Sequence, residues 1–155
     1  MATKELVFRS LITKRPEAMW QRGTSLAGIN EECSPWLALW PPRGVESLVD
    51  APGPVGEVWF DVWLFFLRVL PIDRMRFRLT SLEESAFVEE STLFWLSRWR
   101  HARTVTSKGE SCVIEDALTF EARVPGTGWL AAAFVWFLFD HRHRRLRARQ
   151  GGRAA

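Results

Sequence analysis

The sequence predicts a single α+β domain in which a run of antiparallel strands precedes one long C-terminal helix. Three observations carry this prediction. Short apolar segments separated by turn residues follow one another from residue 57 to residue 123, and eleven apolar residues in a row occupy Trp129–Phe139. A basic run follows at once: six Arg against one Asp give residues 140–155 a charge of +5, so the rest of the chain carries −2 of the total of +3.

The composition suits a globular domain with a sizeable apolar interior. The chain has 155 residues, of which 47% are hydrophobic, and this argues against disorder. It has nine Trp and eleven Phe but no Tyr, so its aromatic area carries few polar groups. Such side chains fit either a packed core or the wall of an apolar cavity.

The N-terminal third is expected to hold a strand, two short helices and a second strand. Pro16 suits the first turn of a helix, which should end at Gly23. Thr24 or Ser25 can then cap a second helix, which ends before Pro35. The strands are expected at 5–13 and 36–40, and a loop rich in Pro and Gly follows at 41–56.

The middle of the chain is expected to form a meander of strands. The segment 74–79 alternates Arg with apolar residues, which predicts a half-buried strand with a cationic outer face. Turns are expected at Pro71–Asp73 and Ser107–Glu110. The other strands are expected at 57–70, 86–94, 98–106 and 111–123, before a helix from about residue 129 to about residue 149.

The last hairpin can be given a register. If Lys108 and Gly109 form a two-residue turn, the apolar residues of both strands share one face. The expected opposite pairs are then Val105 with Cys112, Arg103 with Ile114, His101 with Asp116, and Trp99 with Leu118. A connection at 95–97 in the preceding hairpin would place Leu93 opposite Trp99, Ser91 opposite His101, and Glu89 opposite Arg103.

These registers predict a polar cluster on an otherwise apolar inner face, made of Glu89, Ser91, His101, Arg103 and Asp116. Buried charges need partners, so the expected ion pairs are Glu89 with Arg103 and Asp116 with His101. The cluster could orient a polar group of a ligand, supply a general acid or base through His101, or only fix the strand pairing. The absence of a nucleophile motif from the sequence favours the first and third interpretations over catalysis.

The order of several segments resembles the START-like helix-grip superfamily, also called SRPBCC, and its small bacterial members of unassigned function. The resemblance runs from Glu5 to Arg149 and rests on PEAMW, LAGINEECSPWL, LPIDR, FVEES, WRHART, GESCVIEDALTFEAR and FDHRHRRL. It implies a seven-stranded antiparallel sheet curved around the C-terminal helix. It also implies one domain at 1–150, to which we add a flexible tail at 151–155 as an expectation.

The resemblance also implies a cavity between sheet and helix. In this superfamily, such a cavity often takes sterols, lipids, polyketides or aromatic compounds. We therefore expect a carrier or sensor that binds an apolar small molecule without cofactor. The helix face expected at the cavity is Trp129, Ala133, Trp136 and Phe137. The expected walls are Phe60, Phe66, Phe77, Trp99, Leu118 and Phe120, with Glu89, Ser91, His101, Arg103 and Asp116 as polar groups.

Two alternatives stay open. One is a cyclase- or aromatase-like enzyme that uses His101, Asp116 and Glu89 as acid and base groups. The other is an interaction module with a closed cavity, whose outer helix face (Val135, Phe139) and Arg-rich C-terminus contact a protein, a second copy of the chain or an anionic membrane.

Other classes of site are not expected. His141 and His143 lie two apart on a helix and point in different directions, so no metal site is predicted there. Basic residues near Trp95–Arg103 alternate as in a strand, so no nucleic acid partner is predicted. The first residues lack the apolar stretch of a secretory signal, and Cys33 and Cys112 are expected as buried reduced thiols, which together predict a cytoplasmic protein.

Overall fold

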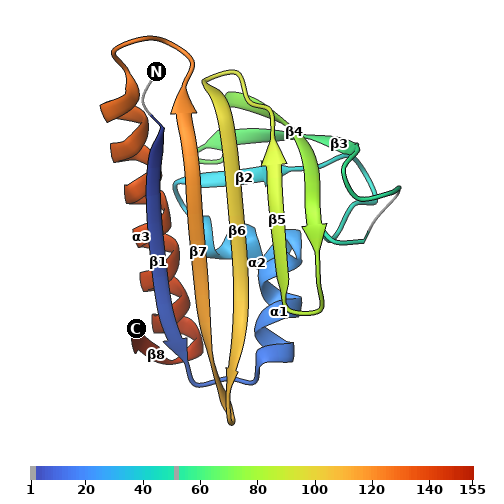
Figure 1. Ribbon diagram of the computed structural model, residues 1–155, viewed down its shortest axis with the longest axis vertical. Coiled ribbons are helices and arrows are strands. Elements are labelled where there is room, and N and C mark those ends of the chain that lie inside the picture. Colours follow the sequence, from blue (N-terminus) through green and yellow to red (C-terminus); the bar gives the residue numbers. More distant parts are fainter. Residues whose placement is uncertain (1–2, 51–52) are drawn as a thin grey trace.

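The structure, a computed structural model that describes residues 3–50 and 53–155, is an α+β fold built on one curved antiparallel sheet. The strand order is β2-β3-β4-β5-β6-β7-β1-β8 (Figure 1). The strands are β1 (Lys4–Ile12), β2 (Leu37–Trp40), β3 (Val58–Phe66), β4 (Leu70–Leu82), β5 (Ala86–Ser91), β6 (Leu96–Lys108), β7 (Ser111–Ala122) and β8 (Gly152–Ala154). The helices are α1 (Pro16–Thr24), α2 (Leu26–Cys33) and α3 (Gly128–Gln150).

The expected fold class is confirmed, and the start of the chain follows its local signals. Pro16 begins α1, and the Ser25 side chain accepts a hydrogen bond of 3.1 Å from the backbone N–H of Gly28 to cap α2. Figure 1 shows α3 running along β1 and β7, while α1 and α2 lie behind β5 and β6. The three helices therefore share the inner side of the sheet.

The strand count is eight rather than the expected seven, because the tail is part of the sheet. Residues 152–154, expected in a flexible tail, form β8 and pair with Ser10–Ile12 of β1. The open edge of β1 offers unpaired backbone groups that the tail can satisfy. A Cβ at Gly152 would lie 2.1 Å from the carbonyl oxygen of Leu11, so this close pairing requires glycine.

One expected turn is wrong. Pro71–Asp73 belong to β4, and the chain instead reverses at residues 67–69. Leu67 and Arg68 take left-handed backbone conformations there, with φ of 50° and 65°. β3 and β4 stay paired up to Phe66 and Leu70, so the chain reverses within the three residues between them.

Both predicted hairpin registers are wrong by two residues. The two-residue turn of the last hairpin is Gly109–Glu110, where Gly109 has a φ of 66°, and Arg103 therefore lies opposite Asp116. In the preceding hairpin, His101 lies opposite Glu89. A shift of two residues keeps every side chain on its face, because the side-chain period of a strand is two. The predicted polar cluster thus remains on the inner face with different opposite pairs.

The inner surface of α3 differs from the expected one. Val135 and Phe139, expected on the outer face, are 5% and 3% exposed and pack in the core. Trp129 and Trp136, expected to face inward, are 70% and 51% exposed.

Among the described residues, no helix combines the length and apolar composition that a membrane span requires.

Candidate functional site

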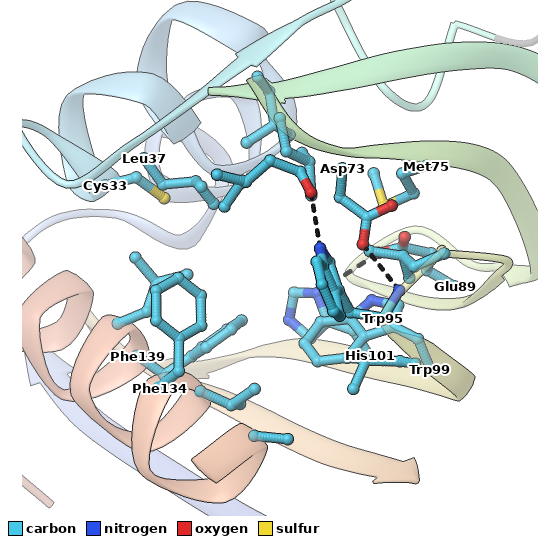
Figure 2. A pocket seen from close by; sticks show the side chains of 18 of the residues that line it. Cys33, Leu37, Asp73, Met75, Glu89, Trp95, Trp99, His101, Phe134 and Phe139 are labelled. Atoms are coloured by element: carbon cyan, nitrogen blue, oxygen red, sulfur yellow. Dashed lines mark hydrogen bonds and ion pairs between the residues drawn. The ribbon is translucent and has the colours of Figure 1, made fainter. Parts of the chain in front are cut away.

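A cavity of about 500 Å³ lies between the curved sheet and the helices. The residues that line it come from the three helices, strands β2 to β7 and their connections, and most of them are apolar. Figure 2 shows Phe134 of α3 on one side and Trp95 on the opposite side. Phe139 of α3 packs against Trp99 and His101, with ring centroids 6.2 and 5.3 Å apart. The volume falls within the range of about 300–1,000 Å³ that is usual for small-molecule sites.

Asp73 shapes one part of this wall. Its carboxylate accepts hydrogen bonds from the backbone N–H groups of Phe94 (2.8 Å), Trp95 (3.2 Å) and Arg74 (2.7 Å). The indole N–H of Trp95 donates back to the carbonyl oxygen of Ile72 at 2.7 Å (Figure 2). These bonds hold the β5–β6 connection against β4, so Asp73 positions the cavity wall and its own oxygens are satisfied.

A buried carboxylate behind the cavity organises a polar network. Asp116 on β7 is fully buried and accepts two hydrogen bonds from Arg103, at 2.7 and 2.6 Å. It also accepts from His101 Nε2 at 2.7 Å and from His143 Nε2 on α3 at 2.8 Å. His143 Nδ1 is 2.8 Å from Ser10 Oγ, so the network ties β1, β6, β7 and α3 together.

Burial alone would raise the pKa of Asp116, but the guanidinium of Arg103 and the ring of His101 hold it well below its usual range. Burial would lower the pKa of His101, but the carboxylates of Asp116 and Glu89 raise it. Both nitrogens of His101 face these carboxylates, because Nδ1 is 3.7 Å from Glu89 Oε1. The environment therefore favours an imidazolium held between two carboxylates.

A second carboxylate joins the network from α2. Glu32 is 2% exposed and lies 3.2 Å from Arg142 Nη2 and 3.7 Å from Arg103 Nη1. The guanidinium of Arg142 lies over the ring of Phe139, at 4.8 Å from its centroid, and Arg142 lines the cavity. Within the described residues, Arg142 Nε and Glu32 Oε1 have no hydrogen-bond partner.

Cys33 also lines the cavity, and burial raises the pKa of its thiol to about 11. Cys33 and Cys112 are both buried free thiols. A thiol with this pKa stays protonated near neutral pH, so Cys33 contributes a small apolar surface to the wall.

Of the predicted polar residues, Glu89 and His101 line the cavity. Ser91 donates to Glu89 Oε2 at 2.6 Å, and both ends of that pair are buried. Arg103 and Asp116 lie behind the cavity and hold His101 in place. The expected Asp116–His101 pair is present, whereas the expected Glu89–Arg103 pair is replaced by Asp116–Arg103 and Glu89–His101.

Among the predicted apolar wall residues, Trp99 lines the cavity. Phe77, Leu118 and Phe120 are buried in the core beside it, and Phe60 stacks on Phe77 with ring centroids 5.1 Å apart. Phe66 stacks on Trp36 instead.

The face of α3 that lines the cavity is Leu130, Ala131, Phe134, Val135, Leu138, Phe139 and Arg142. The predicted face lies elsewhere: Trp129, Ala133 and Trp136 are exposed, and Phe137 packs edge-on against Trp36 at 5.2 Å.

Glu32, Arg142 and His143 are site residues that the sequence reasoning missed. Arg142 and His143 stand in the basic run that follows the apolar stretch of α3, and both are buried. The two histidines of that run separate as expected, since His141 Nε2 contacts the carbonyl oxygen of Ser34 at 2.6 Å while His143 reaches Asp116. The signal for burial was the spacing of His143 from Val135 and Phe139, eight and four residues earlier on the same face.

Comparison with known proteins identifies the fold. The family model described as "Domain of unknown function (DUF8410)" matches residues 10–150. No curated protein matches the sequence. Solved structures similar to it show the same helix-grip fold, and one of them is a START superfamily protein.

Three of these structures illustrate the likeness. A START superfamily protein from Mycobacterium smegmatis has a TM-score of 0.66 at 11% identity, covering 94% of this chain and 96% of its own. Zhui aromatase/cyclase from Streptomyces sp. R1128 has a TM-score of 0.70 at 9% identity, with 96% and 94% covered. Norcoclaurine synthase from Thalictrum flavum has a TM-score of 0.63 at 11% identity, with 94% and 84% covered.

Proposed function

Because this chain belongs to the DUF8410 family, whose function is unknown, we propose its role from the site itself: it binds an apolar small molecule between the sheet and α3. One observation carries the proposal, the cavity of about 500 Å³ with apolar walls. Water in a space with few polar partners makes few hydrogen bonds, so its replacement by an apolar guest lowers the free energy of the system. The guest classes that suit it are lipid-, sterol- and polyketide-like or aromatic molecules.

The polar groups of the wall give the guest an orientation. Glu89 Oε2 accepts from Ser91, while Oε1 is 3.7 Å from His101 Nδ1, beyond the length of a hydrogen bond. Glu89 Oε1 therefore keeps capacity to accept a proton donor such as a hydroxyl group. We infer a guest with an apolar body and one hydroxyl or similar donor.

The environment of His101 supports binding over catalysis. A general base needs a free nitrogen lone pair directed at the substrate. Both nitrogens of His101 face carboxylates, and those carboxylates raise its pKa. With Nε2 bonded to Asp116 and Nδ1 facing Glu89, His101 positions Glu89 and presents no free lone pair to a guest, which supports a carrier or sensor over general-base catalysis by His101.

A small hydroxylated aromatic is a fitting first probe. The solved norcoclaurine synthase is in complex with dopamine and hydroxybenzaldehyde, both of which are phenols. We therefore choose 1-naphthol, with naphthalene as the partner that lacks the hydroxyl. Quenching of tryptophan fluorescence reports binding, because Trp95 and Trp99 line the cavity.

Two alanines of α3 provide a matched pair of variants. Ala131 lines the cavity, whereas Ala133, two residues on, is exposed and does not. We expect Ala131→Phe to weaken 1-naphthol binding at least about tenfold by filling the cavity, and Ala133→Phe to leave it unchanged. Glu89→Gln should reduce the preference for 1-naphthol over naphthalene. The proposal fails if the wild type shows no saturable binding, or if both alanine variants lose it equally.

A further inference from the structure

The opening of the cavity can be located from residues that both line it and reach solvent. Trp95, Val124, Leu130 and Phe134 line the cavity and are 55%, 48%, 55% and 39% exposed. We call these four residues the mouth. They come from the β5–β6 connection, the β7–α3 connection and the first turns of α3, which Figure 1 shows at the same end of the molecule.

Apolar side chains continue outward from the mouth. Phe94 and Trp129, each next to a mouth residue in the chain, are 68% and 70% exposed. The Phe94 ring packs edge-on against Trp95 at 5.2 Å and presents its far side to solvent. A cluster of exposed aromatic side chains is costly in water, and such clusters mark surfaces that bind another apolar body.

The β3–β4 turn is linked to α3 through Trp36. Leu67 N–H donates to the carbonyl oxygen of Trp36 at 3.0 Å, and Trp36 packs against Phe137 of α3. Val69 in this turn and Leu70, the first residue of β4, are 77% and 55% exposed. The apolar surface around the opening thus includes a third segment of the chain.

The charges within the segments that form this surface are all positive, and Glu121, one residue outside them, lies opposite Arg98 in the β6–β7 pairing. The segments 66–72, 92–98 and 122–139 contain Arg68, Arg98 and Arg123, and no Asp or Glu. Asp73, at the end of the first segment, is buried and accepts three backbone N–H groups. Arg123 donates to the carbonyl oxygens of Leu93 and Phe94, which keeps its positive charge beside the mouth.

We propose that this end of the molecule docks on the surface of an anionic lipid bilayer. Tryptophan and other aromatic side chains prefer the boundary between headgroups and acyl chains, and Arg near a negatively charged membrane is attracted to it. Docking would turn the mouth toward the acyl chains, so an apolar guest could pass between membrane and cavity without crossing water. Passage of a guest rests on the proposed function, whereas docking itself does not.

The test is co-sedimentation with vesicles of phosphatidylcholine alone and of phosphatidylcholine with phosphatidylglycerol. The charge variant is Arg68→Glu with Arg98→Glu. Its control is Lys14→Glu with Lys108→Glu, an equal charge change near the β6–β7 turn at the opposite end of the molecule. The apolar variant is Phe94→Ser with Trp129→Ser. Its control is Trp63→Ser, which is 47% exposed on the outer face of β3, since the neighbouring Leu64 lines the cavity.

We expect the wild type and both controls to bind the anionic vesicles, with binding that weakens as salt rises. The charge and apolar variants should each bind at least about tenfold more weakly. The proposal is overturned if the wild type does not bind anionic vesicles, or if controls lose as much binding as mouth variants. It is also overturned if light scattering shows a dimer that the apolar variant converts to a monomer, because a second copy would then cover the mouth. Loss of docking with intact 1-naphthol binding would leave the proposed function standing.

Discussion

Replacing Arg103 by Met should destabilise the protein strongly, because it removes the main partner of the buried Asp116. The two side chains are 2% and 0% exposed and share hydrogen bonds of 2.7 and 2.6 Å. Removing one partner of a buried ion pair costs about 3–5 kcal/mol, since the remaining charge stays buried. His101 and His143 still hold Asp116 in the variant, which places the cost near the lower end, at about 3 kcal/mol.

The assay is urea unfolding followed by circular dichroism, together with a thermal melt. For a protein of this size, about 3 kcal/mol corresponds to a decrease in Tm of about 6–12 °C. Arg9→Met is the matched control, because Arg9 pairs with Glu115, the residue before Asp116, at 2.6 Å. That pair is 53% and 36% exposed, so its loss should cost about 1 kcal/mol or less.

The comparison refutes the reasoning if the two Arg→Met variants have equal stability within about 0.5 kcal/mol. Such a result would mean that Asp116 is solvated or that the network adds nothing beyond a surface pair. A large loss confined to Arg103→Met would instead assign the difference to burial, since residue type and pairing distance are alike.

Two further predictions concern the same network. The carboxylates of Asp116 and Glu89 raise the folded-state pKa of His101 above its value in the unfolded chain, so their stabilisation is complete below about pH 6.5 and declines as the pH rises through the folded-state pKa. Urea unfolding between about pH 6 and about pH 8 should therefore show the stability of the wild type falling toward that of His101→Gln, and parallel curves would contradict the pKa shift. Gly23→Ala should destabilise, because its Cβ would lie 2.7 Å from Arg103 Nη1, whereas Gly128→Ala meets its nearest atom, Lys4 Cε, at 3.6 Å and should be neutral or stabilising. Equal melting temperatures for these two glycine variants would show that the Arg103 side chain moves aside freely.

The face of the polar cluster could be predicted from the sequence, although its pairings could not. The alternation of polar and apolar residues in β6 and β7 fixes which side chains point inward. The alternation does not distinguish registers that differ by two residues. The predicted register was wrong because it placed the turn at Lys108–Gly109, whereas the turn is Gly109–Glu110. His101 still reaches Asp116 diagonally across the two strands, at 2.7 Å.

The cavity face of α3 could not be predicted for a different reason. A helix that is apolar on every side gives no periodic signal, so Trp129–Phe139 carries no indication of which face the sheet covers. Trp129 and Trp136 were predicted to face inward because they are large aromatic residues. The buried face instead consists of Val135, Leu138 and Phe139. The burial of Arg142 and His143 within the basic run could not be predicted from the sequence. The carboxylates that pair with them, Glu32 on α2 and Asp116 on β7, are distant in the sequence.

The most direct test of the central claim is to locate a bound guest between the sheet and α3. Nuclear Overhauser effects between the ring protons of 1-naphthol and isotope-labelled methyl groups of the protein would do this. The account predicts contacts to the methyl groups of Ala131 and Leu138, which line the cavity, and none to that of Ala133. Contacts to Ala133, or no contacts at saturating 1-naphthol, would contradict it.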